Sequence, residues 1–167
     1  MAEYDKDYMQ EHCIDVYFRY GERPFHVLTY GTIIPALLND VDRNRSLQHQ
    51  TAVDWEALAI PSVVNINYEY VSAVRRESIQ AAGDMARYEQ LIPDEDTIVQ
   101  MFKPNAELGF YSYDCVEELE DGKGRYRLVA YPGMEINVHD FDTLPEFTGI
   151  EVAEEDEESG IILQFKM

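Results

Sequence analysis

The sequence predicts a single α+β domain with an N-terminal β-hairpin, a helical middle and a C-terminal antiparallel β-meander. Apolar residues alternate with polar ones near the N-terminus and again beyond residue 108, which is the period of half-buried strands. Between residues 71 and 103 the spacing changes to that of helices. No internal repeat or long linker divides the chain, so one domain is predicted over residues 13–167, after a polar arm at residues 1–12.

The predicted hairpin follows the polar arm, which is expected to be frayed or to form a short helix. Apolar and polar side chains alternate over residues 14–20, so this stretch is predicted to be a strand. Residues 21–24 contain the Gly and Pro of a turn, and residues 25–30 form the second strand. A short helix is expected after Gly31-Thr32.

The middle of the chain is predicted to be mainly helical. A polar loop at residues 42–50 precedes a helix that Thr51 caps and Pro61 ends. The later predicted elements, in order, are a strand at residues 63–70, a helix at residues 71–91, and a helix that starts at Pro93 and stops before Pro104.

The remainder is predicted to be rich in strands, with acidic residues at its turns. Gly122 and Gly124 mark a hairpin turn between two long alternating stretches. The predicted elements are strands at residues 108–119 and 125–131 around a turn at 120–124, a strand at 134–141, and strands at 150–152 and 161–165 around an acidic loop at 154–158.

Charge is the most informative property of the composition. The chain has 33 Asp and Glu against 13 Lys and Arg, a net charge of -20 on 167 residues. This net charge produces a negative electrostatic field around the molecule, which repels nucleic acid and anionic lipid and attracts basic partners. No basic stripe with interleaved aromatic residues is present, which disfavours direct nucleic-acid binding. Residues 114–158 are more strongly acidic than the rest of the chain.

The cysteine content and the lack of long apolar segments indicate the cellular compartment and argue against a bound cofactor or metal. Two cysteines, Cys13 and Cys115, make neither a disulfide framework nor a zinc cluster. The acidic N-terminus has no apolar segment of a signal peptide, and no apolar run is long enough to cross a membrane. We therefore expect a cytoplasmic protein with no membrane contact, no cofactor and no bound metal.

Catalytic signatures are weak, so the sequence favours a protein that is not an enzyme. His139-Asp140 with Asp142 is the most site-like cluster, because His and carboxylates can share a divalent ion. Neighbours on a strand point to opposite faces, however, and no second cluster supports this one. A pocket around Asn65, Asn67 and Glu69 is the other enzyme-type possibility.

The favoured function is inhibition of a basic nucleic-acid-handling partner, such as a nuclease, through a carboxylate-rich surface. DNA presents about one negative charge per 1.7 Å of duplex axis, and a rigid acidic surface can occupy the same basic groove. DNA mimics among anti-restriction and anti-CRISPR proteins, and immunity proteins, work by this physics. The predicted contact residues are Glu117, Glu118, Glu120, Asp121, Glu154, Glu155, Asp156, Glu157 and Glu158, with Tyr111, Tyr113 and Tyr126 as aromatic anchors.

Two alternatives stay open. A protein-binding module or secretion-type chaperone would present an exposed patch rich in Tyr and Phe and could form a homodimer. A small hydrolase or metal-binding enzyme would have a deep pocket around His139. The run Glu154–Glu158 is also compatible with a solvated hairpin tip that protects a sheet edge from aggregation.

Overall fold

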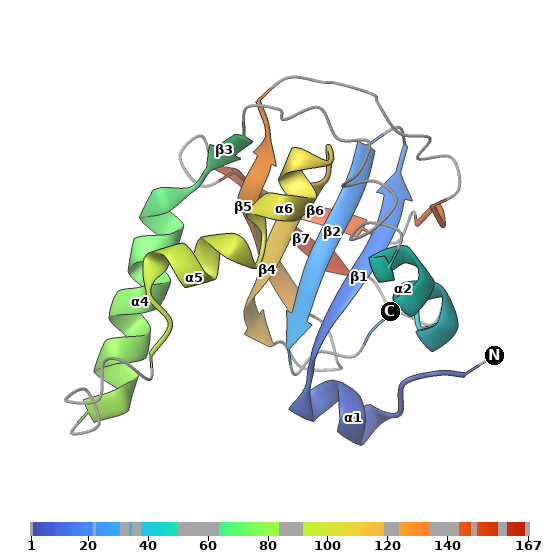
Figure 1. The fold of residues 1–167 in the computed structure, drawn as a ribbon, viewed down its shortest axis with the longest axis horizontal. Helices are drawn as coiled ribbons and strands as arrows, with labels where there is room; N and C mark the ends of the chain where they lie inside the picture. Colours follow the sequence, from blue (N-terminus) through green and yellow to red (C-terminus); the bar gives the residue numbers. More distant parts are fainter. Residues whose placement is uncertain are drawn as a thin grey trace.

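The structure is a computed structural model whose described part contains helices and one mixed sheet, and it confirms the predicted single α+β domain (Figure 1). The described residues are 2–21, 23–30, 34, 38–49, 64–83, 92–118, 124–133, 144–147, 150–156 and 160–165. Predicted features that lie wholly or mainly outside them are the helix after Gly31-Thr32, the helix from Thr51 to Pro61, the turn at 120–124 and the strand at 134–141.

The N-terminal arm contains a short helix, and the predicted hairpin follows it. Helix α1 (Lys6–Glu11) begins at Asp5, whose carboxylate accepts a 2.8 Å hydrogen bond from the Tyr8 amide. Strands β1 (Cys13–Tyr20) and β2 (Arg23–Tyr30) then pair antiparallel along their whole length. The hairpin is therefore confirmed, and of the two forms expected for the arm the structure has the helix.

A parallel pairing, which the sequence did not predict, joins this hairpin to the C-terminal strands. Strand β4 (Tyr111–Glu118) lies parallel to β2, with His26 opposite Ser112 and Leu28 opposite Asp114. Strand β5 (Gly124–Pro132) continues the sheet antiparallel to β4. The hairpin and the C-terminal strands consequently share one sheet instead of packing as separate units.

Strand β5 has two partners on its far side. The short β3 (Val64–Ile66) pairs with its C-terminal end, and β7 (Gly160–Phe165) pairs with its N-terminal end. Strand β6 (Ile150–Asp156) pairs with β7 and ends the sheet order β1-β2-β4-β5-β7-β6. The C-terminal strands are antiparallel as predicted, but β7 lies between β5 and β6, so they do not follow chain order.

The polar stretch predicted to be a loop at residues 42–50 is a helix, α2 (Val41–His49), so that prediction is wrong. A side chain before the helix explains its start, because the Asp40 carboxylate accepts a 2.9 Å hydrogen bond from the Arg43 amide. Val41, Asn44 and Leu47 recur every third residue and are buried. The helix thus has a buried side that the polar composition concealed.

The predicted strand at residues 63–70 is shorter than expected, because a helix begins inside it. Helix α4 (Tyr68–Ala82) starts at Asn67, whose Oδ1 accepts from the Tyr70 amide at 3.2 Å while its Nδ2 donates to the Leu128 carbonyl. This double anchorage stops β3 at Ile66 and turns the chain onto the sheet.

The predicted helix after Pro93 is two helices. Helix α5 (Glu95–Gln100) is capped by Asp94, which accepts a 2.7 Å hydrogen bond from the Thr97 amide. Helix α6 (Lys103–Glu107) follows, with Pro104 in its first turn. Proline is favourable there because a first-turn N–H has no partner within the helix. The expectation that Pro104 only stops a helix was therefore wrong.

Buried side chains lie on both faces of the sheet at strands β1, β2, β4 and β5. Helices α4, α5 and α6 pack on one face, where Val71, Val99 and Phe102 meet Val129 of β5 (Figure 1). The other face buries the alternating residues of the hairpin together with the rings of Tyr113 and Tyr126; its main members are Ile14, Val16, Phe18, Phe25, Val27, Tyr113, Tyr126 and Leu128.

Candidate functional site

The predicted acidic contacts lie on two strands of the sheet where they are described. Glu117 and Glu118 end β4, opposite Arg125 and Gly124 of β5. Glu120, Asp121, Glu157 and Glu158 lie outside the described residues.

The predicted acidic loop is mostly the end of a strand. Glu154, Glu155 and Asp156 belong to β6, opposite Ile162, Ile161 and Gly160 of β7. The prediction of a loop beginning at residue 154 is therefore wrong, because pairing with β7 extends the strand by four residues, three of them acidic. Charged residues are well suited to β6, which is the last strand in the sheet order.

Two of the three predicted aromatic anchors are in the core. The side chains of Tyr113 and Tyr126 are 0% exposed, so the prediction that they meet a partner is wrong. Large rings on alternate positions of neighbouring strands are the groups that best fill a sheet core. Tyr111 is half-buried, with the Arg23 guanidinium 4.4 Å from its ring centroid and the Tyr131 ring stacked at 6.2 Å.

Carboxylates dominate the surface of the described residues. The exposed ones are Glu3, Asp5, Asp7, Glu11, Asp42, Glu69, Glu77, Asp94, Asp96, Glu107 and Glu146. The exposed Lys and Arg residues there are Lys6, Arg23, Arg45 and Arg76. Among these carboxylates, Glu107 and Glu146 form ion pairs with other described residues, at 3.9 and 3.4 Å. The negative charge is thus largely uncompensated at this surface.

A buried hydrogen-bond network connects β1, β2 and β4. The His26 imidazole is 0% exposed and lies between Ser112 Oγ, 2.6 Å from Nδ1, and Asp15 Oδ1, 2.7 Å from Nε2. A carboxylate only accepts, so in the neutral ring Nε2 donates to Asp15 and Nδ1 accepts from the Ser112 hydroxyl. Gln48 of α2 donates to the other Asp15 oxygen at 3.0 Å.

This Ser-His-Asp combination is not arranged for nucleophilic catalysis. Ser112 is 0% exposed, so a substrate carbonyl cannot reach its hydroxyl in this fold. The Tyr17 ring covers the imidazole, with ring centroids 5.0 Å apart. We interpret the network as structural, because it satisfies the polar atoms of a buried histidine across three strands.

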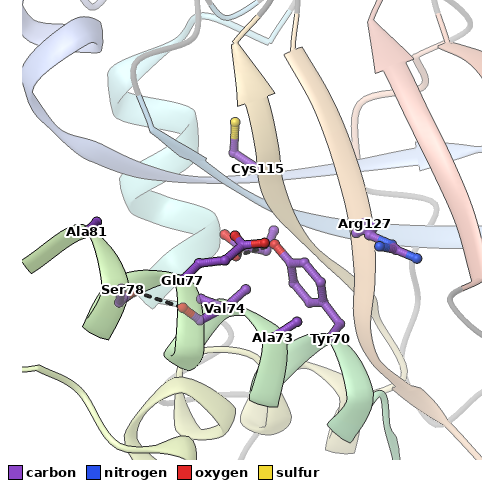
Figure 2. Close-up of a pocket in the computed structure, with 9 residues that line it drawn as sticks. Tyr70, Ala73, Val74, Glu77, Ser78, Ala81, Cys115 and Arg127 are labelled. Atoms are coloured by element: carbon purple, nitrogen blue, oxygen red, sulfur yellow. Dashed lines mark hydrogen bonds between the residues drawn. The ribbon is translucent and has the colours of Figure 1, made fainter.

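A groove lies between α4 and the strands β4 and β5 and has a volume of about 380 Å³ (Figure 2). Helix α4 lines it at helical spacing, so one side of the helix faces the sheet. The lining residues are Tyr70, Ala73, Val74, Glu77, Ser78 and Ala81 of α4, Asp114 and Cys115 of β4, and Arg127 of β5.

The polar centre of the groove is the pair Tyr70 and Asp114. The Tyr70 hydroxyl donates to Asp114 Oδ2 at 3.0 Å, and the Arg127 guanidinium lies 5.6 Å from the Tyr70 ring centroid. Burial raises the pKa of Asp114 to about 6, although hydrogen bonds from Tyr70 and from the Cys115 amide, and the nearby His26, act in the opposite direction. Burial, together with the adjacent Asp114, also raises the pKa of Tyr70.

Only some residues of the enzyme-type predictions lie in the described part of the chain. His139, Asp140 and Asp142 lie outside it. Asn67 is the helix cap described above, whereas Asn65 is exposed on β3. Within the described ranges, no group of three or more His, Cys, Asp or Glu is placed to hold a metal ion.

Sequence reasoning missed both the histidine network and the groove. The predicted turn at residues 21–24 would pair Tyr20 with Phe25, whereas the observed register pairs Tyr20 with Arg23 and Tyr17 with His26. Nothing local placed Ser112 or Asp114 near His26, because that proximity depends on the parallel β2–β4 pairing.

Comparison with known proteins finds no match among protein-family models, curated proteins or solved structures. None of the helices in the described ranges has the length and apolar character needed to cross a bilayer.

Proposed function

We propose that this protein binds and inhibits a basic nucleic-acid-handling protein, without catalysis, by presenting carboxylates where that partner holds phosphates. The observation that carries the proposal is the excess of exposed carboxylates over exposed cations on the described surface. A net charge of -20 on an ordered α+β domain favours fast, salt-dependent association with a cationic surface.

The sheet register supports a contact surface at the acidic C-terminal strands. Glu117 of β4 lies opposite Arg125, Arg125 opposite Gln164, and Gln164 opposite Glu151 of β6. These four positions form a row across the sheet, with Glu117 at one end and Glu151 at the other. Neighbouring strands are about 4.8 Å apart, so the row is roughly 14 Å long. The backbone register sets the spacing of these two acidic positions, which supports a contact surface on these strands.

The test begins with capture of binding proteins from a lysate of the native host at low salt, followed by elution as salt is raised. We expect a basic nucleic-acid-binding protein to elute, and its affinity for this chain to fall steeply with salt. Capture of only neutral or acidic proteins, or binding that does not change with salt, would contradict the proposal.

Two matched triple variants then locate the contact. Glu117→Lys, Glu118→Lys and Glu154→Lys reverse three charges at the acidic strands, whereas Glu3→Lys, Asp7→Lys and Glu11→Lys reverse three around α1. Both sets change the net charge equally. We expect the first set to weaken partner binding by well over tenfold and the second by much less. Equal losses would mean that only the overall field matters.

The alternative of an aromatic binding patch has less support. The large apolar side chains that are exposed in the described part are Tyr8, Tyr20, Tyr68 and Met101, which belong to different elements or their ends. Scattered exposed apolar residues are normal for a protein surface.

A further inference from the structure

The groove between α4 and β4 is a cavity that neither the histidine network nor the acidic strands use. Its walls include Ala73, Val74 and Ala81, which are apolar, and its polar end holds Asp114 and the Tyr70 hydroxyl. Ligand pockets of proteins start at about 300 Å³, so a volume of about 380 Å³ is enough for one side chain or a small ligand.

The charged residues that line the groove favour an occupant of positive charge. Asp114 and Glu77 contribute two carboxyl groups, and Arg127 contributes one cation. In the view of Figure 2 the Tyr70 ring lies between Glu77 and the Arg127 guanidinium. Arg127 is also the residue of β5 directly opposite Asp114 in the sheet register, so the groove brings one cation close to its carboxyl groups. With both carboxyl groups ionised the lining is negative, and the strongly negative chain adds to this attraction.

We propose that this groove receives an arginine side chain of the basic partner, with Asp114 as the buried counter-ion, Glu77 as the carboxylate at the rim and the apolar walls around the methylene stem. The inference rests on the proposed function and names one contact of the same partner. A planar guanidinium matches a carboxylate, and its stem packs well on small apolar residues.

The surroundings of Asp114 suit this occupant. Its carboxyl group is held by Tyr70, so its orientation is fixed before binding. The groups that face it are Tyr70 and Glu77 from α4, His26 from β2, Arg127 from β5 and the adjacent Cys115. An entering cation would favour the ionised form that burial disfavours, so binding is expected to lower the pKa of Asp114 and to weaken below pH 6.

The experiment is an NMR titration of the full chain with N-acetyl-arginine methylamide at low salt, at pH 5 and pH 7.5. We expect saturable shifts at the amides of Glu77, Ser78 and Cys115 at pH 7.5, and at least tenfold weaker binding at pH 5. Asp114→Asn should abolish the saturable shifts. Glu69→Gln removes one charge from the same helix outside the groove and should change the affinity less than twofold.

Glu77→Gln provides a second variant at an exposed helical position, in case Asp114→Asn perturbs the fold. It should weaken binding severalfold while leaving the rest of the spectrum unchanged. Absence of saturable shifts at these amides, or identical titrations for the wild type and Asp114→Asn, would overturn the inference.

The two proposals fail in different ways. If the arginine derivative does not bind but the captured partner still does so in a salt-dependent manner, the groove inference is wrong and the proposed function stands. If the derivative binds but no basic partner is captured, the groove is an arginine site and the inhibitor proposal loses its support.

Discussion

The Tyr70 hydroxyl donates a 3.0 Å hydrogen bond to Asp114 Oδ2, which ties the first turn of α4 to the middle of β4. The bond forms between residues 44 positions apart, so it depends on the packing of the helix on the sheet. It also places a carboxyl group where water is largely excluded, and that burial raises the pKa of Asp114 to about 6.

Asp114 should make the stability of the fold depend on pH. Its folded-state pKa of about 6 is above the ordinary value of 3.8, so between these values the native state binds more protons than the unfolded state. Its contribution is therefore most favourable at low pH and declines as pH rises toward 6. At one pKa unit per 1.36 kcal/mol, the cost at pH 7.5 is at most about 3 kcal/mol.

Asp114→Asn removes that cost, so the variant should be more stable than the wild type at pH 7.5, and by about half as much at pH 5. Urea unfolding at the two pH values measures the difference. Glu69→Gln, an exposed position on the same helix, should show no such trend. A stability difference between Asp114→Asn and the wild type that stays constant with pH would contradict the raised pKa.

Ser112→Ala should destabilise the fold by about 1–3 kcal/mol, because it leaves Nδ1 of the buried His26 without its hydroxyl partner. Ser78→Ala is the matched control, since the Ser78 hydroxyl bonds to the Val74 carbonyl on an exposed part of α4. Free energies of unfolding from urea titrations compare the two variants. Equal, small effects would show that the buried network contributes little.

Tyr113→Phe should raise the free energy of unfolding by about 1 kcal/mol, because the Tyr113 hydroxyl is buried and has no hydrogen-bond partner among the described residues. The same burial raises the pKa of this hydroxyl. Thermal and urea unfolding would measure the gain, and partner affinity should not change because the ring is 0% exposed. A loss of stability would indicate that the hydroxyl is satisfied in solution.

Asn67→Ala should cost about 1–2 kcal/mol, because it removes the cap of α4 and the hydrogen bond to the Leu128 carbonyl. Asn65→Ala, two residues earlier and exposed on β3, should be nearly neutral. Circular dichroism with urea unfolding would distinguish these outcomes. If Asn65→Ala were the more damaging change, the structural role assigned to Asn67 would be wrong.

Some errors of sequence interpretation share a local cause. The Asp40 side chain caps α2, which lies in a stretch predicted to be a polar loop. The Asn67 side chain caps α4, which begins where the sequence predicted that β3 would continue. Hydrophobic periodicity carries no information about a single capping hydrogen bond. The start of α2 and the end of β3 were therefore both predicted wrongly. Pro104 was ambiguous for a related reason, since proline both ends one helix and suits the first turn of the next.

The sequence by itself determined the α+β class, the N-terminal hairpin and the net charge, because alternation, turn residues and ionisable groups act locally or simply add. Only the tertiary structure decided which residues share a site. The parallel contact of β2 with β4 brings Ser112 to His26 across 86 positions, and the packing of α4 brings Tyr70 to Asp114. Such long-range pairings depend on the whole arrangement of strands and helices, which no local pattern encodes.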